Sequence, residues 1–241
     1  MTTVADAIHI ALAEVGYHEG RSGGHWNNRE KYARAIKLDN GTRPLEWVVA
    51  SREAWCAVFN CWVLWKVGAL DLLPGGPTAS VAHMMDAAKQ VNQWSEYPAI
   101  GALIVYGNGE HTGFVVDYDD TTVTTVEGNT NLNGSPEGDG VYKKVHHRTD
   151  PWVTGYVYIK YPEGIESADP KWQHAKPKRK HRMHTHSEAK KANRPTRVTH
   201  ARKPMHTALH ILNASVHNGR TGAVRIARND LRKAIHHLPE R

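Results

Sequence analysis

Hydrophobic residues in the first part of the chain recur at spacings of three and four, the period of a helix that buries one face. Gly16 ends the first such stretch, and Ser51 is of a residue type that caps helices, so we expect it to precede the third. This third stretch, which contains Trp55–Trp65, is apolar on nearly all sides, so it should lie in the middle of a domain. The four predicted helices span residues 3–15, 29–38, 52–68 and 81–91.

After Pro98 the pattern changes to alternating or continuous runs that are rich in Val, Thr and Tyr and separated by Gly, Asn and Asp. Asp119 and Asp120 lie between two of these runs and predict a hairpin that sets two strands side by side. Helices first and an antiparallel sheet second indicate an α+β fold. The predicted strands span residues 102–106, 112–118, 122–127, 141–145 and 153–161.

Aromatic residues and charge both divide the chain near Pro162. Of the 8 Trp, 9 Tyr and 2 Phe, only Trp172 lies beyond Tyr161, so residues 1–162 hold the material for a large core. These residues carry 13 Lys and Arg against 18 Asp and Glu, a net charge of −5, whereas the remaining 79 carry 18 against 6, a net charge of +12. The whole-chain charge of +7 therefore describes a basic tail on an acidic domain.

The tail divides into two parts. Residues 163–203 are basic and almost free of large apolar residues, which predicts a solvated linker. Residues 204–241 show two short amphipathic patterns around Asn218 and Gly219, which predicts a basic helical hairpin. Three interpretations of the tail compete: a solvated extension without a partner, attraction to an anionic envelope of wall polymer or membrane surface, and nucleic-acid binding. Attraction to the envelope is favoured because it needs no specific contact.

Two Cys, Cys56 and Cys61, are too few for a disulfide scaffold. On one helix their Cα atoms stand about 8 Å apart, beyond bridging range, so we expect free thiols, as in a protein made in a reducing cytoplasm. Unpaired amides and the helix dipole at a helix start favour a thiolate, which makes Cys56 a candidate nucleophile. The alternative to a nucleophile is a Cys that only fills space in the core as a small apolar residue, and we expect this role for Cys61.

A nucleophilic Cys needs a base and a third group that orients the base. His111 stands at the start of one predicted strand, and Glu127 stands at the end of the next. With a turn at Asp119 and Asp120, the two side chains become neighbours across an antiparallel ladder. Cys56, His111 and Glu127 therefore form a candidate catalytic set.

Five blocks of residues 1–162 stand out in order along the chain: Gly16-Tyr17-His18-Glu19, Asn27-Asn28 with Lys31-Tyr32, Trp55-Cys56-Ala57-Val58-Phe59, His111-Thr112-Gly113-Phe114-Val115 and Val126-Glu127-Gly128-Asn129-Thr130. Together they resemble the CHAP domain, the cysteine, histidine-dependent amidohydrolase/peptidase of the papain-like and NlpC/P60 superfamily, as it occurs in bacteriophage endolysins. The NlpC/P60 branch usually has Asp-Cys-Ser at the nucleophile and a second His as third residue, and this chain has neither.

The resemblance implies that Cys56 is the nucleophile and His111 the base, with Glu127 and Asn129 as polar partners. It implies a papain-like fold and no cofactor. Two features depart from the family: Gly101 is followed by Ala102, where many members have Gly-Asp, and residues 39–55 lack the density of carboxylates that calcium prefers. We therefore expect no metal.

Together these features predict a monomeric endolysin that cleaves an amide bond in bacterial peptidoglycan, as an N-acetylmuramoyl-L-alanine amidase or as an endopeptidase. The N-terminus has no basic leader or long apolar core, so we expect synthesis in the host cytoplasm and release through a separate pore. No specific nucleic acid is expected as a partner. The alternative is a nucleic-acid-binding protein with a degenerate papain-like domain.

Overall fold

The computed structural model describes residues 3–132 and 138–172. The chain divides into two units, Met1–Lys180 and His181–Arg241, and the described residues belong to the first. The helical hairpin expected over residues 204–241 lies outside the described residues. Within these residues no helix is long and apolar enough to cross a membrane. The helices are α1 (Val4–Ala13), α2 (Tyr32–Ala35), α3 (Glu46–Ser51), α4 (Cys56–Lys66), the 3-10 helix η1 (Leu70–Leu72) and α5 (Val81–Gln90).

Two antiparallel sheets accompany these helices. The main sheet has six strands in the order β3-β8-β4-β5-β6-β7, and a separate ribbon pairs β1 with β2. The expected α+β arrangement with an antiparallel sheet is confirmed for the described residues, and so is the hairpin at Asp119 and Asp120, which joins β5 to β6. The strands are β1 (Arg21–Ser22), β2 (His25–Trp26), β3 (Trp94–Ser95), β4 (Leu103–Tyr106), β5 (His111–Tyr118), β6 (Thr122–Thr130), β7 (Gly140–His147) and β8 (Val153–Val157).

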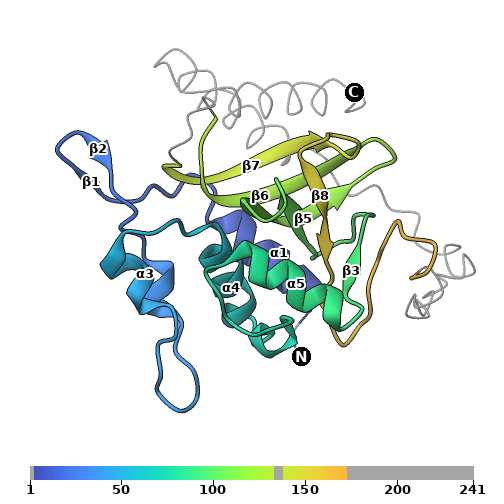
Figure 1. Cartoon of the computed structure of the whole chain (residues 1–241), viewed down its shortest axis with the longest axis horizontal. Helices are drawn as coiled ribbons and strands as arrows, with labels where there is room; N and C mark the ends of the chain where they lie inside the picture. Colours follow the sequence, from blue (N-terminus) through green and yellow to red (C-terminus); the bar gives the residue numbers. More distant parts are fainter. Residues whose placement is uncertain (1–2, 133–137, 173–241) are drawn as a thin grey trace, which may run out of the picture. The chain divides into compact units, whose positions relative to one another are not determined.

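The helix α4 is the centre of the core, as its apolar composition predicts. All of its residues from Cys56 to Leu64 are buried. It packs on β5 and β6, while α1 and α5 contact β5 and β8, so these three helices lie together against one side of the sheet (Figure 1). Alternation along the strands then divides the apolar residues between two clusters. One cluster packs with the helices and includes Leu103, Val105, Phe114 and Val126. The other cluster includes Ile104, Tyr106, Val115 and Val123.

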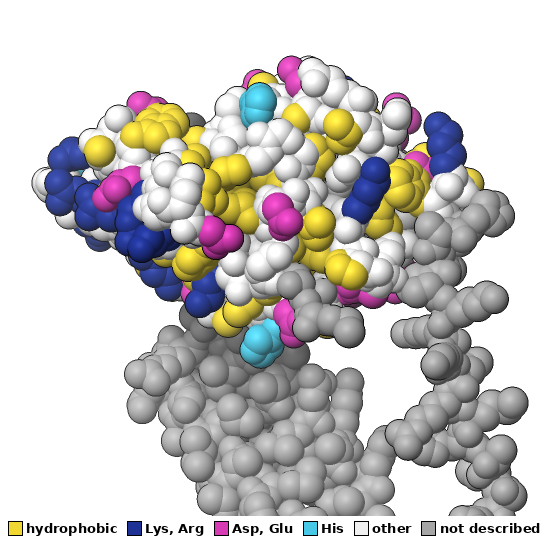
Figure 2. All heavy atoms as spheres, turned by 90° about the horizontal axis from the view of Figure 1, so that it is seen from below, with side chains coloured by type: hydrophobic (Ala, Val, Ile, Leu, Met, Phe, Trp, Pro, Cys, Tyr) yellow, Lys and Arg dark blue, Asp and Glu magenta, His cyan; other side chains and the backbone are white. Residues whose placement is uncertain are grey.

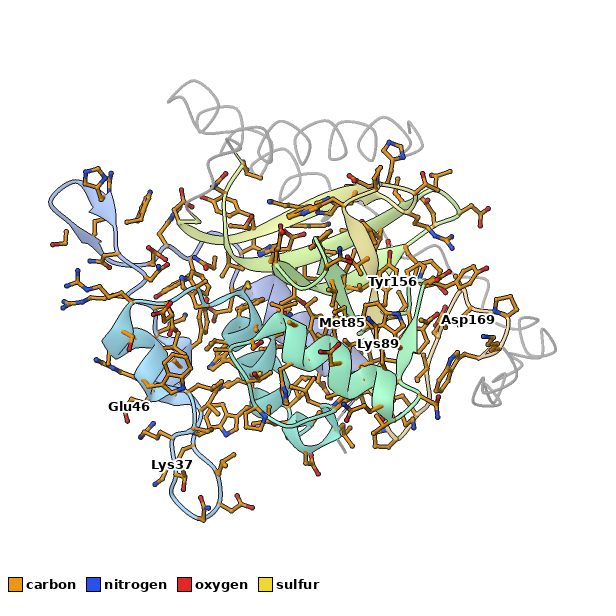
Figure 3. All side chains as sticks on the ribbon, in the orientation of Figure 1. Lys37, Glu46, Met85, Lys89, Tyr156 and Asp169 are labelled. Carbon is orange, nitrogen blue, oxygen red and sulfur yellow. The ribbon has the colours of Figure 1, made fainter. Side chains whose placement is uncertain are left out.

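The side chains follow this division into core and surface. Met85 of α5 is buried between the helix and the sheet, while Lys37 and Glu46 are exposed on the α2–α3 side of the domain (Figure 3). Exposed basic side chains gather in the same region, where β1, β2 and α3 lie, although residues 1–162 carry a net charge of −5 (Figure 2). They include Arg21, Arg29, Arg34, Arg43 and Arg52.

The start of the buried helix differs from the expectation. Ser51 is not its N-cap but the last residue of α3, a helix that the sequence pattern did not indicate. Arg52 closes α3 in a left-handed conformation with φ of 58°, and α4 begins only at Cys56. The N-cap residue is Trp55, whose side chain makes no capping hydrogen bond. Cys56 is therefore the first residue of α4, nearer to the helix end than an N-cap at Ser51 implies.

Other element ends also differ. The helix expected over residues 29–38 is only the four-residue α2, and β6 continues three residues past Glu127 to Thr130.

The fold also continues past Pro162, where a solvated linker was expected to begin. Ser167 is buried, pairs with Ala99 in an isolated bridge, and shares a 2.5 Å hydrogen bond with the hydroxyl of Tyr158. Residues 163–172 are thus part of the folded domain.

Candidate active site

Cys56 occupies the first position of α4, where the helix leaves backbone N–H groups without intrahelical partners. The N–H of Trp55, which immediately precedes it, donates a 2.9 Å hydrogen bond to Oδ1 of Asn129 from the end of β6. The backbone N–H of the N-cap residue is thus paired with a side chain from another element. This contact fixes where α4 starts relative to the strand that carries Glu127.

The indole of Trp55 is hydrogen-bonded, as its backbone N–H is. Its Nε1–H donates to Oε2 of Glu19 at 2.6 Å, and Oε1 of the same carboxylate accepts the N–H of Asn28 at 2.7 Å. Asn28 in turn accepts a hydrogen bond from Nδ2 of Asn129 at 3.1 Å. Glu19, Asn28 and Asn129, which belong to three of the family-like blocks, therefore form one network around the residue before Cys56.

His111 opens β5, and its imidazole joins Cys56 to Glu127. Its Nε2 lies 3.1 Å from Oε2 of Glu127, and Cys56 is near enough to the ring to raise its pKa. A carboxylate can only accept, so Nε2 carries the proton in this contact and Nδ1 is the ring nitrogen left to act as a base. Burial opposes protonation of the ring, but hydrogen bonds and charge from Cys56 and Glu127 outweigh burial and raise the pKa of His111 to about 9.

Glu127 is completely buried, yet its carboxylate is fully partnered. Oε1 accepts hydrogen bonds from the hydroxyls of Tyr106 at 2.8 Å and Thr125 at 2.6 Å, and it lies 2.7 Å from Nε2 of His146. Oε2 faces His111 and lies 3.5 Å from Nζ of Lys144. Burial favours the neutral acid, but the hydrogen bonds from both His rings and the nearby positive charges hold the pKa of Glu127 well below its usual range.

Two glycines make room for this arrangement. A Cβ atom on Gly113 of β5 would lie 2.5 Å from Cγ of Glu127, so only glycine leaves space for the carboxylate there. A Cβ atom on Gly128 of β6 would lie 2.6 Å from Cβ of Phe59, so this glycine lets the strand approach α4. Both glycines stand in blocks that resemble the family.

A buried polar link connects the Cys-bearing helix to the His-bearing strand. Asn60, one turn after Cys56, donates from Nδ2 to the hydroxyl of Thr112 at 3.1 Å, and Thr112 donates to the carbonyl of Ile104 at 2.7 Å. The side-chain carbonyl of Asn60 is buried and has no hydrogen-bond partner among the described residues. Because Thr112 directly follows His111, this link helps to fix the helix against the strand.

Of the four residues singled out in the sequence, three gather at one place, because His111 contacts Glu127 directly and Cys56 is near enough to raise the pKa of His111. Asn129 instead hydrogen-bonds Trp55 and Asn28. Sequence reasoning missed four neighbours of Glu127, namely Tyr106, Thr125, Lys144 and His146. A signal was present, because Lys144 and His146 share one face of a strand and are polar.

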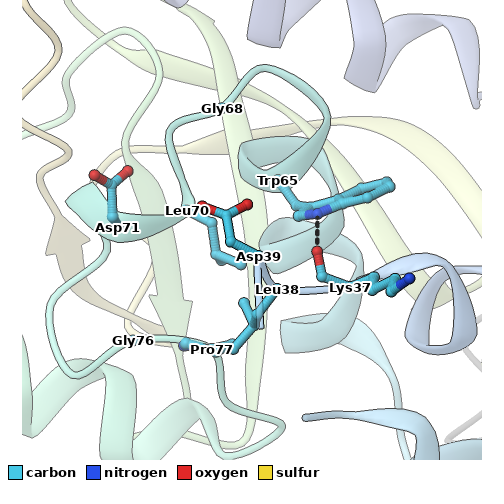
Figure 4. A pocket seen from close by; sticks show the side chains of 9 residues that line it. All are labelled: Lys37, Leu38, Asp39, Trp65, Gly68, Leu70, Asp71, Gly76 and Pro77. Atoms are coloured by element: carbon cyan, nitrogen blue, oxygen red, sulfur yellow. Dashed lines mark hydrogen bonds between the residues drawn. The ribbon is translucent and has the colours of Figure 1, made fainter. Parts of the chain in front are cut away.

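Other features of the described residues stand apart from this centre. Among these residues no three His, Cys, Asp or Glu side chains are arranged to hold a metal ion. A surface pocket lies at the other end of α4, where Trp65 donates from Nε1 to the carbonyl of Lys37 at 2.9 Å (Figure 4). Since α4 has 11 residues, this pocket is about 15 Å from Cys56 along the helix. Cys61 is buried and free, as expected, and burial raises its pKa to about 12.

Comparison with known proteins matches part of the chain to a family model. Residues 47–129 match the model of the CHAP domain, a span that contains Cys56, His111, Glu127 and Asn129. No curated protein and no solved structure matches the chain. The CHAP match indicates a papain-like, cysteine- and histidine-dependent hydrolase of the amidase or peptidase type, with peptidoglycan as its substrate.

Proposed function

We propose that the protein is a bacteriophage endolysin that cleaves an amide bond of the wall peptide with Cys56 as nucleophile. The observation that carries the mechanism is the contact of His111 with the buried carboxylate of Glu127, next to Cys56 at the start of α4. The CHAP match over residues 47–129 supports the substrate class.

In the proposed reaction, His111 accepts the thiol proton of Cys56, and the thiolate attacks the carbonyl carbon of the amide. Backbone N–H groups in the first turn of α4 stabilise the oxyanion. The imidazolium then protonates the leaving amine as the C–N bond breaks, which leaves a thioester. Water attacks the thioester with His111 as base, and the acid product and free thiol are released.

Glu127 supports both proton transfers. Its charge stabilises the imidazolium, and its contact with Nε2 keeps Nδ1 directed at the sulfur. Asn129 acts differently in this proposal, because it holds the backbone of Trp55 and thereby positions Cys56. The two polar partners implied by the family resemblance thus divide into an orienting group for His111 and a positioning group for Cys56.

The proposal includes a cellular setting. The enzyme is made in the host cytoplasm as a monomer, reaches the wall through a separate pore, and is attracted to anionic wall polymer or membrane surface by its basic tail. Residues 173–241 hold 17 Lys and Arg against 3 Asp and Glu, and this charge supports non-specific attraction.

The test is lysis of purified cell walls, followed as loss of turbidity. Cys56→Ser should abolish lysis, whereas Cys61→Ser, the matched variant on the same helix, should retain it if the core stays folded. Circular dichroism of both variants controls for folding. Full lysis by folded Cys56→Ser protein would contradict the proposed mechanism. If the wild-type protein binds DNA in a gel shift and shows no lysis, the nucleic-acid alternative is favoured. Mass spectrometry of the released muropeptides identifies the bond cut, as an amidase or an endopeptidase product.

A further inference from the structure

One stretch of the catalytic domain reverses the sign of its charge. Residues 20–54 hold 7 Lys and Arg against 4 Asp and Glu, a net charge of +3, whereas the rest of residues 1–162 hold 6 against 14, a net charge of −8. Exposed basic side chains accordingly gather in one region of the domain, where β1, β2 and α3 lie (Figure 2). The domain therefore presents a local basic surface on an otherwise acidic body.

This basic surface consists mainly of arginine. Of the 6 Arg in residues 1–162, 5 lie within residues 20–54, whereas Lys predominates among the basic residues of the other part. The planar guanidinium group presents its N–H donors as a fork that fits two oxygens of one anion, which the ammonium group of Lys does not. The five exposed residues, here called the arginine surface, are Arg21, Arg29, Arg34, Arg43 and Arg52.

Backbone contacts bring three of these arginines together from separate segments. The N–H of Gly20, which precedes Arg21, donates to the carbonyl of Arg29 at 2.9 Å. Asn28, which precedes Arg29, donates from Nδ2 to the carbonyl of Arg52 at 3.0 Å. Arg21, Arg29 and Arg52 are therefore neighbours in space, although 31 positions separate the first from the last.

The other two arginines extend the surface along α2. Arg34 belongs to α2, and the guanidinium group of Arg43 donates to the carbonyl of Arg34. The helix α2 packs against α3, the helix that Arg52 closes. The arginine surface is thus one continuous region that is built from β1, α2, α3 and the loops between them.

The domain itself leaves the charge of this surface largely uncompensated. None of the five guanidinium groups forms an ion pair with a carboxylate of the described residues. Of the four acids in residues 20–54, Glu30 is buried and accepts the N–H of Ala33 at 3.0 Å, so it offers no carboxylate to the solvent side. Like charges that gather without partners repel one another, and a bound polyanion removes this repulsion.

The arginine surface reaches the start of α4. Arg52 is four residues before Cys56, so their Cα atoms are at most about 14 Å apart. Asn28, which binds the carbonyl of Arg52, also accepts a hydrogen bond from Asn129, and Asn129 accepts the N–H of Trp55. A polymer on this surface therefore lies beside the end of α4 that carries the nucleophile.

We propose that the arginine surface binds a phosphodiester polymer of the bacterial wall and thereby brings Cys56 to the peptidoglycan beside that polymer. This inference rests on the proposed function, because it takes the wall as the place of action. Several guanidinium groups spread over one surface suit a chain of repeated phosphates better than the single carboxylate of one wall peptide. The basic tail supplies attraction without orientation, whereas the arginine surface directs one end of the catalytic domain to the polymer.

The first test variant of the full-length protein removes charge from the arginine surface. It combines Arg29→Gln, Arg34→Gln and Arg52→Gln, because within the described residues these three form hydrogen bonds only through backbone groups. Circular dichroism and thermal melts check that the fold is kept. The Kd for soluble poly(glycerol phosphate) at 0.1 M salt should rise by about tenfold, which corresponds to about 0.5 kcal/mol for each charge removed.

The control variant removes the same charge from other parts of the domain. It combines Lys89→Gln, Lys143→Gln and Lys160→Gln, which change exposed side chains on α5, on β7 and after β8. The tail is intact in both variants, and their net charges are equal. The Kd of the control should rise by no more than about twofold, because charges more than about 10 Å from the polymer are largely screened at this salt concentration.

The outcomes separate the arginine surface from the tail and from the proposed function. An equal rise of Kd in the two variants, or no binding of the polymer by the wild-type protein, would overturn the assignment. Duplex DNA with the same number of phosphates is the comparison ligand, and a larger loss of affinity for DNA than for the polymer in the first variant would assign the surface to nucleic acid instead. Release of muropeptides by the wild-type protein is scored separately. A wild-type protein that releases none, yet binds the polymer through the arginine surface, would contradict the hydrolase and still support this inference.

Discussion

The carboxylate of Glu127 reaches His111 along a diagonal of the sheet. Continuing the β5–β6 register from the pair Phe114 and Val126 places Glu127 opposite Gly113, two residues beyond His111. The missing side chain of Gly113 leaves the space through which Glu127 extends to Nε2 of His111 at 3.1 Å. His111 and Gly113 are two residues apart on β5, so they share one face of the sheet with Glu127, which lies opposite Gly113. Glu127 can therefore reach His111 diagonally because Gly113 has no side chain in the way.

Glu127 and Asn129 should respond differently to substitution. Glu127→Gln keeps the shape but removes the charge that stabilises the imidazolium, so turnover should fall by about 100-fold or more. Asn129→Ala removes the acceptor of the Trp55 N–H, so it should lower the unfolding free energy by about 1 kcal/mol and cost less turnover than Glu127→Gln. His111→Ala should be worse than either. Wall-lysis rates and thermal melts check this order, and a larger catalytic loss from Asn129→Ala in folded protein would assign it the orienting role.

The pH dependence of turnover should report His111. The ring must be protonated to release the amine, and Cys56 and Glu127 raise its pKa to about 9, so activity should fall as pH rises through about 9. Glu127→Gln removes one of the groups that favour the protonated ring, so the alkaline limb of its residual activity should move to lower pH. Initial rates on soluble wall fragments across pH 6–11 measure the limb. An alkaline limb that stays in place in Glu127→Gln protein would show that the carboxylate does not set this pKa.

The two glycines should separate activity from stability. In Gly113→Ala the new methyl group meets the Glu127 side chain, which can rotate away from His111, so activity should be lost with the fold retained. In Gly128→Ala it meets Phe59 and Trp55, which are fixed in the core, so the unfolding free energy should fall by about 1–3 kcal/mol. Lysis rates and denaturant melts of both variants provide the comparison. A fully active Gly113→Ala protein would show that the space is not needed.

Salt should separate the tail from the catalytic domain. The screening length falls from about 10 Å at 0.1 M to about 3 Å at 1 M, so binding of the full chain to walls should weaken across that range. A protein cut after Trp172, where the described fold ends, loses a segment of net charge +14 and should bind walls weakly at every salt concentration. It should still cleave soluble fragments. Wall pull-down across a salt series measures both forms, and equal binding at low salt would show that the tail is not the anchor.

The sequence by itself determined the local elements and the identity of the reactive groups. The apolar run around Cys56 predicted a buried helix, and the Asp119-Asp120 turn predicted the β5–β6 hairpin, because both signals depend on residues close together in the chain. The hairpin in turn made His111 and Glu127 candidates for one site. The local sequence pattern was therefore enough to select Cys56, His111 and Glu127 as candidates for one site.

Only the tertiary structure decided where the helix begins and what surrounds the carboxylate. Ser51 is a good capping residue by type, but α4 begins at Cys56, and the N–H of its N-cap residue Trp55 is bound by Asn129, which is 74 residues away in sequence. The partners of Glu127 come from four strands, β4, β5, β6 and β7, and His146 is 19 residues away in sequence. Such contacts depend on strand order and register. The polar face of β7 points to Lys144 and His146, but a solvated edge strand has the same local pattern, so only the tertiary structure shows that this face is turned toward a buried charge.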